Sequence, residues 1–261
     1  MVSPVTASGF DVVRLAETDS TNDVAIALAR EGAPDRTVVV ADFQRRGRGR
    51  LDRRWEAPAG TALLCSVLLR VELAASERHL CTVAVGLAAT DACRTVWDLD
   101  AGLKWPNDLV VSDRKLGGVL AETDGRVEVD GTVAIVVGLG VNVRWPGPPE
   151  AGGTSILECA VRDVEPEDVL SAYLEALDAH DVALRSANGR AELARAYRAR
   201  LVTIGRRVRI QLAEESVVGT AQDVTDDGQL VVATDKGPRT IASGDAVHLR
   251  PASEGSSEAR E

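Results

Sequence analysis

The sequence is poor in the residues that most often build metal centres, disulfides and hydrolytic triads. It has four cysteines and three histidines in 261 residues. No Cys-x-x-Cys pair is present, which disfavours both a zinc site and a disulfide framework. The histidines show neither metal-ligand spacing nor a Ser-His-Asp set, which disfavours a triad hydrolase. We expect the four cysteines to be small core residues: Cys65, Cys81, Cys93 and Cys159.

Long apolar segments and a positive net charge are also missing. No apolar run is long enough to span a bilayer, and the first ten residues do not resemble a signal peptide, so we expect a cytoplasmic protein without a membrane partner. The formal net charge of -10 disfavours general nucleic-acid binding, because an acidic surface repels polyanions. The hydrophobic content of 45% is typical of a globular chain, and the length suits one ordinary domain plus a small one.

The apolar pattern before residue 205 predicts an α+β domain after a short polar start. A first helix is expected to begin at Ser20, which has capping-box spacing to Asp23, and to end at Gly32. The other predicted elements are strands over 37–43, 61–70, 102–111, 115–123 and 131–143, and helices over 76–97, 166–186 and 190–201. The apolar side of the helix over 76–97 is predicted to carry Leu80, Val83, Leu87 and Val96.

The pattern changes at Gly205 to short alternating segments separated by turn residues. Such closely spaced short strands predict a small β-barrel of about 45 residues. We therefore expect one domain over residues 1–204, a second over 205–251, and a disordered tail over 252–261.

Positive charge is concentrated in one loop. The stretch "QRRGRGRLDRRW", Gln44 to Trp55, has six arginines and two glycines, and Asp52 is its only acid. In an acidic protein so dense a positive segment is expected to bind a small, concentrated negative charge such as a phosphate group. Its glycines favour a loop that stays mobile until substrate binds. A solvated surface turn is the alternative interpretation.

Lysine is the rare cation in this chain, with three residues against 27 arginines. Two of them, Lys104 and Lys115, lie within twelve residues of each other. Because lysine is a compact charge on a flexible stem, this proximity indicates a site where a guanidinium would not fit, although chance clustering also explains it. Two other features are equivocal. Ser20 is either a helix cap or a site residue, and "GLGVN" over 138–142 lacks the spacing of a dinucleotide-binding fingerprint.

Four segments in order carry a resemblance to a known family. They are "DSTND", "QRRGRGRLDRRW", "KWPNDLVVSDRKLGGVLAE" and "VVGLGVNV", and "KWPND" followed by "KLGG" is the most specific pair. Together they resemble the biotin protein ligase family over residues from about 15 to 145. The resemblance implies an α+β catalytic domain of the class II aminoacyl-tRNA-synthetase-like, biotinyl/lipoyl ligase type with a mixed sheet. A small SH3-like β-barrel would follow it, and would close the adenylate site or dock the carrier.

The resemblance also implies a reaction and a set of residues. Such enzymes join biotin to ATP, giving biotinyl-5'-AMP, and pass biotin to a lysine of a biotin carboxyl carrier protein, with Mg²⁺ as the metal. Biotin would be bound by Ser20, Thr21, Asn22, Gln44, Gly47, Arg48, Lys115, Gly117 and Gly118. ATP and the adenylate would be bound by Arg48, Gly49, Arg50, Trp55, Asn107, Lys115 and Asn142. The catalytic residues would be Lys115, Arg48 and Arg50, and Asp108 would bind Mg²⁺ or orient Lys115.

The chain departs from the family pattern at two places. Asp52 replaces a glycine that often follows "GRGR", so we expect the loop to be stiffer and self-paired through Asp52, and we assign no role to Arg53 and Arg54. Some members of the family carry an N-terminal helix-turn-helix domain, which nineteen residues before Ser20 cannot form. With the acidic charge, this predicts a ligase that does not bind DNA.

Two other functions compete with this interpretation. A lipoate–protein ligase would use similar adenylate chemistry, but "GRGR" and "KWPND" favour biotin. A non-catalytic nucleic-acid or partner-binding module would use the arginines as an RNA contact, and would leave the lysine pair unexplained. The sequence determines neither the oligomeric state nor the carboxylase whose carrier accepts biotin.

Overall fold

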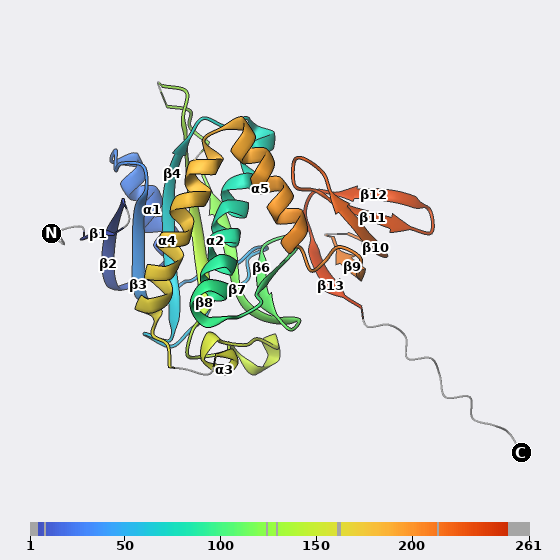
Figure 1. Ribbon diagram of the computed structural model, residues 1–261, viewed down its shortest axis with the longest axis horizontal. Helices are drawn as coiled ribbons and strands as arrows, with labels where there is room; N and C mark the ends of the chain where they lie inside the picture. The colour runs from blue at the N-terminus through green and yellow to red at the C-terminus, as the bar shows by residue number, and fades with distance from the viewer. Residues whose placement is uncertain are drawn as a thin grey trace, which may run out of the picture.

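Two β-sheets organise the chain in the computed structural model, which describes residues 5–7, 9–123, 125–128, 130–160, 163–212 and 214–249. The larger sheet is mixed and eight-stranded, and the smaller is antiparallel and five-stranded (Figure 1). This confirms the predicted α+β fold with a mixed sheet. The tail predicted over 252–261 lies outside the described residues.

The larger sheet contains four of the strands predicted before residue 205, the segment predicted over 102–111 as two antiparallel strands separated by a turn over 105–107, and two further strands that precede the first helix. In spatial order its strands are β1 (Val5–Ala7), β2 (Phe10–Thr18), β3 (Thr37–Gln44), β4 (Ala62–Val71), β8 (Val133–Asn142), β7 (Arg114–Glu122), β6 (Asp108–Val111) and β5 (Gly102–Lys104). The strands β2 and β3 are parallel, and every other neighbouring pair is antiparallel. The polar start predicted before the first helix was wrong, because it contains β2, in which Asp11, Arg14 and Glu17 interrupt the apolar residues and weaken the strand pattern.

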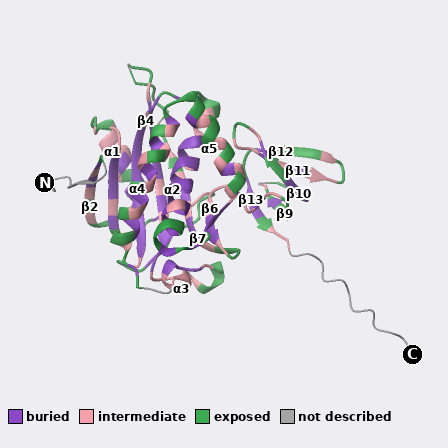
Figure 2. Cartoon of the chain, in the orientation of Figure 1, coloured by how far each residue is buried: buried purple, intermediate pink, exposed green. Residues whose placement is uncertain are grey.

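Helices cover the two faces of this sheet unequally. On one face lie α2 (His79–Trp97), α4 (Pro166–Leu184) and α5 (Ala187–Arg200), which form the main core with the sheet (Figures 1 and 2). On the other face a single helix, α1 (Thr21–Arg30), packs against β3, β4 and β8 through a smaller cluster that includes Ala25 and Leu68. The second face is therefore only partly covered by helices.

Side chains along β4 and β8, the two longest strands, alternate between the two faces of the sheet. Along β4 and β8 the odd-numbered residues join the main core, whereas even-numbered residues such as Leu68 and Val136 face α1. This alternation follows from the two-residue period of a strand. Beyond α1 the next even-numbered positions of β8 are Gly138 and Gly140, so β8 contributes no side chain to this part of the face.

Several local predictions need correction. The side chain of Ser20 makes no capping hydrogen bond, so the predicted capping box is absent although the helix begins where it was expected. Val96 is 36% exposed, because it is nine residues from Leu87 and a helix turns about 100° per residue, which places the two on opposite sides. Three cysteines are buried as predicted, but Cys159 is only partly buried, at the end of the short helix α3 (Ile156–Cys159).

The smaller sheet follows the strand pattern predicted after Gly205. Its strands, in spatial order, are β12 (Gly237–Ile241), β11 (Leu230–Thr234), β10 (Ser216–Val224), β9 (Arg207–Gln211) and β13 (Asp245–His248). It contacts the rest of the chain beside α5 and the turn before β6, where Trp105 Nε1 donates to the Gly228 carbonyl at 3.1 Å. The sheet therefore has a fixed place beside one end of the larger sheet (Figure 1).

Candidate active site

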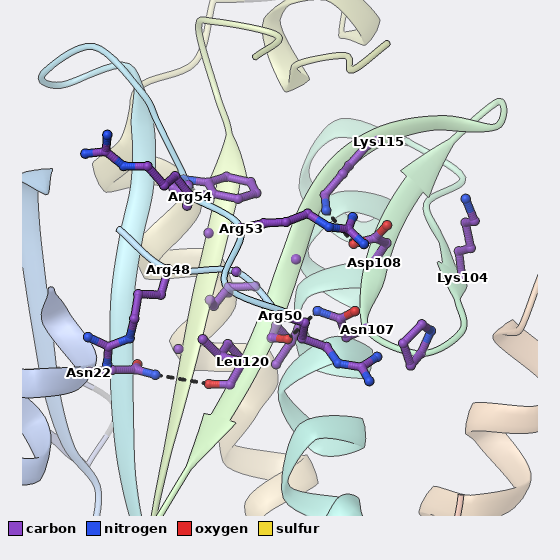
Figure 3. A pocket seen from close by; sticks show the side chains of 18 of the residues that line it. Asn22, Arg48, Arg50, Arg53, Arg54, Lys104, Asn107, Asp108, Lys115 and Leu120 are labelled. Carbon is purple, nitrogen blue, oxygen red and sulfur yellow. Dashed lines mark hydrogen bonds and ion pairs between the residues drawn. The ribbon is translucent and has the colours of Figure 1, made fainter. Parts of the chain in front are cut away.

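A cavity of about 260 Å³ opens over the uncovered part of the larger sheet. Its wall is made by the start of α1, the arginine loop over 44–55, Cys65 of β4, the end of β5 with the turn after it, the β6–β7 hairpin, the glycines of β8 and the first residues of β13. Figure 3 shows Arg48 and Arg54 on one side of this pocket, Lys115 and Asp108 of the hairpin on the other, and Arg50 and Arg53 extending from the loop towards the hairpin side. Segments far apart in sequence thus meet at one site.

Two glycines form the floor of the pocket. A Cβ built on Gly138 would overlap Oδ1 of Asn22, and a Cβ built on Gly140 would lie 2.7 Å from the Trp55 ring. Neither position has room for a side chain unless its neighbour moves. Gly118 also lines the pocket, whereas a Cβ on Gly117 would lie 2.5 Å from the Gly140 carbonyl oxygen, so Gly117 is required for strand packing.

A buried polar cluster stands at one end of the floor. Gln44 Oε1 accepts hydrogen bonds from the backbone N–H of Thr21 at 2.7 Å and from its hydroxyl at 3.0 Å. Ser66 Oγ donates to Asn22 Oδ1 at 2.6 Å, and Asn22 Nδ2 donates to the carboxylate of Glu122 at 2.5 Å. The cluster fixes the side chains of Thr21 and Asn22, which are each less than 5% exposed. Ser20, also buried, borders the same space.

An ion pair holds the ammonium of Lys115 at the other end. The register of β6 with β7 shifts at Leu116, so that Lys115 pairs with Val110 while Gly117 pairs with Leu109. This one-residue bulge puts Lys115 on the open face, where the simple alternation would have turned it towards the main core. Its Nζ lies 2.5 Å from Oδ1 of Asp108 and 5.9 Å from the centre of the Trp55 ring.

The arginine loop folds back on itself. Trp55 N–H donates to Gly47 O at 2.9 Å, and Gly49 N–H donates to Arg53 O at 2.7 Å. At the tip Leu51 and Asp52 have φ angles of 54° and 58°, the left-handed region where the glycine usual in the family would be unstrained. Within the described chain the exposed Asp52 has no ion-pair partner, and the loop arginines pair with other carboxylates, so the predicted self-pairing was wrong.

The cations around the pocket differ in how they are neutralised. Arg48 donates to both carboxylate oxygens of Asp23 at 2.8 Å and to Glu122 at 2.8 Å, and these hydrogen bonds raise the pKa of its guanidinium. Arg50 and Lys104 have no ion pair among the described residues, and burial lowers the pKa of both. Nη1 of Arg50 is buried without a hydrogen-bond partner. These two cations are the ones that a bound anion would stabilise most.

The structure gathers most of the residues predicted from sequence. Those that line the pocket are Ser20, Thr21, Asn22, Gln44, Arg48, Gly49, Arg50, Trp55, Asn107, Asp108, Lys115 and Gly118. Gly47, Gly117 and Asn142 do not line it. Gly47 is packed against the Trp55 carbonyl, and Asn142 donates from Nδ2 to the Thr154 carbonyl at 2.9 Å and so ties down the loop after β8.

Other residues of the site were missed. Lys104 lines the pocket, and the scarcity of lysine already pointed to it. Ser66 bonds to Thr21 and Asn22, and its hydroxyl in the otherwise apolar strand β4 could have indicated a site residue. Asp245, Ala246 and Val247 line the pocket from the smaller sheet, and no pattern in the sequence brings them next to the arginine loop.

Among the described residues no three His, Cys, Asp or Glu side chains gather as a metal site. In the same part of the chain no helix has the length and apolar character needed to cross a membrane.

The chain is similar to known proteins over most of its length. Two family models match: the Biotin/lipoate A/B protein ligase family over residues 15–142 and the Biotin protein ligase C terminal domain over residues 203–249. The Biotin--[acetyl-CoA-carboxylase] ligase of Mycobacterium tuberculosis is 38% identical over 250 residues, which cover 92% of this chain and 89% of that protein. The Bifunctional ligase/repressor BirA of Bacillus subtilis is 26% identical, over 87% of this chain and 70% of that protein.

A solved structure with both ligands bound has the same fold. It is the biotin protein ligase of Aquifex aeolicus in complex with biotin and ATP, with a TM-score of 0.74 and 25% identity over 92% of this chain and 99% of that chain. The two family models, the M. tuberculosis relative and this shared fold agree with one another: the chain belongs to the biotin protein ligase family.

Proposed function

We propose that the protein joins biotin to ATP, forming biotinyl-5'-AMP and pyrophosphate, and then transfers biotin to a lysine of a biotin carboxyl carrier protein. One observation carries the proposal. A single glycine-floored pocket has a buried hydrogen-bonding cluster at one end, and at the other a lysine ammonium with two unpaired cations. This is the arrangement needed to bring a neutral ring system with an acidic chain next to a polyphosphate. The related M. tuberculosis protein is named for this activity.

The polar cluster suits the ureido head of biotin, which has one carbonyl acceptor and two N–H donors. Thr21 and Gln44 are already hydrogen-bonded to each other, so their donor and acceptor atoms are held in place before the ligand arrives. Gly138 and Gly140 let the side chains of Asn22 and Trp55 lie directly against the floor, and these side chains border the space in which a flat ring would bind. Lipoate has no ureido group, so it could not make the hydrogen bonds that this cluster offers to biotin.

Lys115 suits the adenylation step. A biotin carboxylate oxygen attacks the α-phosphorus, the new P–O bond forms, and the bond to pyrophosphate breaks, with no proton transferred. Two anions must approach each other for this, and an ammonium between them relieves their repulsion. Asp108 holds Lys115 at the edge of the pocket, while Arg50 and Lys104 supply uncompensated charge for the phosphates. Carrier transfer then needs a neutral lysine amine to attack the acyl carbon and release AMP.

The resemblance also implied a Mg²⁺ ion, with Asp108 as a candidate ligand. The residues do not form a metal site by themselves, since no three suitable ligands gather in the described chain. The carboxylate of Asp108, which was a candidate ligand, is taken up by Lys115, so orientation of Lys115 is the better role for it. Any Mg²⁺ would therefore have to arrive with the phosphates of ATP, and no step is assigned to it.

The substrates and the net charge also support a proposal about where the protein acts and what it does not bind. The use of ATP and of a carboxylase carrier fits the cytoplasm, and the net charge of -10 fits a ligase that does not bind DNA. Electrophoretic mobility shift with random duplex DNA at low salt tests the second part. Retardation at micromolar protein would contradict it.

The function is tested by transfer of labelled biotin to an isolated carrier domain. We expect wild-type protein to label the carrier with ATP and biotin, and to release pyrophosphate with biotin but not with lipoate. Failure to label any biotin carrier domain would contradict the proposal. Pyrophosphate release driven by lipoate instead would assign the chain to lipoate chemistry.

A further inference from the structure

We propose that Asp245, the first residue of β13, is a positioning residue that holds the arginine loop closed over the pocket through its ion pair with Arg53. The inference rests on the proposed function, because a ligase must retain its reactive adenylate until the carrier arrives. It gives a specific task to the smaller sheet and to an arginine that the sequence left without a role.

The contact joins two parts of the chain that are far apart in sequence. Nη2 of Arg53 and Oδ2 of Asp245 form the pair, and Asp245 lines the pocket together with Ala246 and Val247. The Asp245 side chain is 32% exposed and that of Arg53 is 55% exposed, so the pair sits at the rim, where water reaches it. It is therefore weak enough to open for substrate entry.

The position of Arg53 is transmitted to the rest of the loop by the backbone. The Arg53 carbonyl accepts from Gly49 N–H at 2.7 Å, and Arg53 N–H donates to the Arg50 carbonyl at 3.2 Å. These bonds close a short turn that contains the unpaired guanidinium of Arg50. When Arg53 is held, the backbone that carries Arg50 is held with it.

Every other ion pair found for this loop in the described chain joins a loop arginine to a carboxylate that precedes residue 205. Arg48 pairs with Asp23 and Glu122, and Arg54 lies 3.8 Å from Glu56. Those contacts hold the two ends of the loop. The contact with Asp245 holds its tip, and it is the one that reaches across to the smaller sheet.

The smaller sheet is itself firmly anchored and can serve as a fixed point. Trp105 Nε1 donates to the Gly228 carbonyl at 3.1 Å, and Arg206 lies 3.3 Å from Asp113 at the tip of the β6–β7 hairpin. In β13 the backbone of Asp245 is in register with Gln211 of β9. The carboxylate is thus presented from a strand and not from a flexible turn.

The test uses the full chain and compares Asp245→Ala with a charge swap, Arg53→Asp combined with Asp245→Arg. Glu215→Ala is the matched control, because it removes a carboxylate of the same sheet that pairs with Arg239 away from the pocket. Hydrogen–deuterium exchange is read for the segments 47–55 and 207–211. In parallel, the rate at which bound biotinyl-5'-AMP leaves the enzyme is measured with a filter assay.

For Asp245→Ala we expect exchange in segment 47–55 to rise about fivefold, which is the size expected for loss of an exposed ion pair, and adenylate release to accelerate by a similar factor. Segment 207–211 should exchange as in wild type. The charge swap should restore both values, and Glu215→Ala should change neither.

Three results would overturn the inference: unchanged exchange in the loop, a parallel rise in segment 207–211, or no recovery in the swap. The second would mean that Asp245 only stabilises its sheet. The exchange measurement needs no activity, so it decides this inference even if wild-type protein forms no adenylate and the proposed function fails.

Discussion

Replacing Lys115 by alanine tests the central electrostatic argument. Two unit charges 4 Å apart repel by about 4 kcal/mol at an effective dielectric constant of 20 and by about 1 kcal/mol in bulk water. The Lys115 side chain is 35% exposed, so the ligand-free site lies between these limits, and bound substrates would shift it towards the lower dielectric. We therefore expect loss of Lys115 to raise the activation free energy of adenylation by about 2 to 4 kcal/mol, which corresponds to a rate about 30- to 1,000-fold slower.

The assay is single-turnover release of pyrophosphate with saturating biotin and ATP. Lys236→Ala is the matched control, because Lys236 is the remaining lysine and lies in the exposed turn between β11 and β12. Lys115→Ala combined with Asp108→Asn should recover part of the rate, since the single variant leaves the Asp108 carboxylate without its partner beside two further anions. Transfer from supplied biotinyl-5'-AMP should slow less than tenfold, because the two anions have then already been joined. An adenylation rate for Lys115→Ala within threefold of wild type would refute the reasoning.

Three further predictions concern biotin binding at the glycine floor of the pocket, the reactivity of the cysteine thiols and the stability of the fold at acidic pH. Gly138→Ala should weaken biotin binding at least tenfold with an unchanged circular dichroism spectrum, because the new methyl group displaces Asn22 and overpacking costs about 1 to 3 kcal/mol; calorimetric titration measures it. In the native protein maleimide should modify Cys159 first, since burial raises the pKa of each of the three core thiols to about 12; mass spectrometry after timed quenching decides. Burial lowers the pKa of His79 and of His248, so the unfolded chain binds protons that the folded chain refuses, and stability should fall as the pH drops below about 6.5. Melting temperatures that do not fall from pH 7.5 to 5.5, or that fall equally in a variant with both histidines changed to glutamine, would contradict this.

The sequence predicted the elements with strong periodicity and failed where local and tertiary demands conflict. The strands β4 and β8 are buried on both faces and read as continuous apolar runs, so they were predicted almost to the residue. The strand β2 lies near the sheet edge and has charged residues at 11, 14 and 17 among its apolar ones, so it was missed. Capping was predicted at Ser20 from spacing alone, but its side chain is buried beside the pocket instead of bonding to the helix backbone.

The site was predictable as far as its motifs are local. The arginine loop and the hairpin carrying Lys115 were recognised because each is a contiguous segment with an unusual composition. The pairing of Arg53 with Asp245 was not, because it depends on how two sheets dock and not on any pattern within either. Asn142 illustrates the opposite case: its place in a motif suggested adenylate binding, and in the structure its amide donates to the Thr154 carbonyl and secures a loop. Its part in adenylate binding stays a prediction.

The alternation along the central strands has a consequence for how this chain tolerates change. In β8, residue 137 points into the helical core, whereas residue 138 points to the ligand side. Variation at the odd-numbered positions of β8 should thus affect stability, as should variation at Ala134 and Val136 beneath α1, whereas variation at Gly138 and Gly140 should affect which ligand is recognised. Selection for a new substrate can therefore work on one set of positions and leave the other almost untouched.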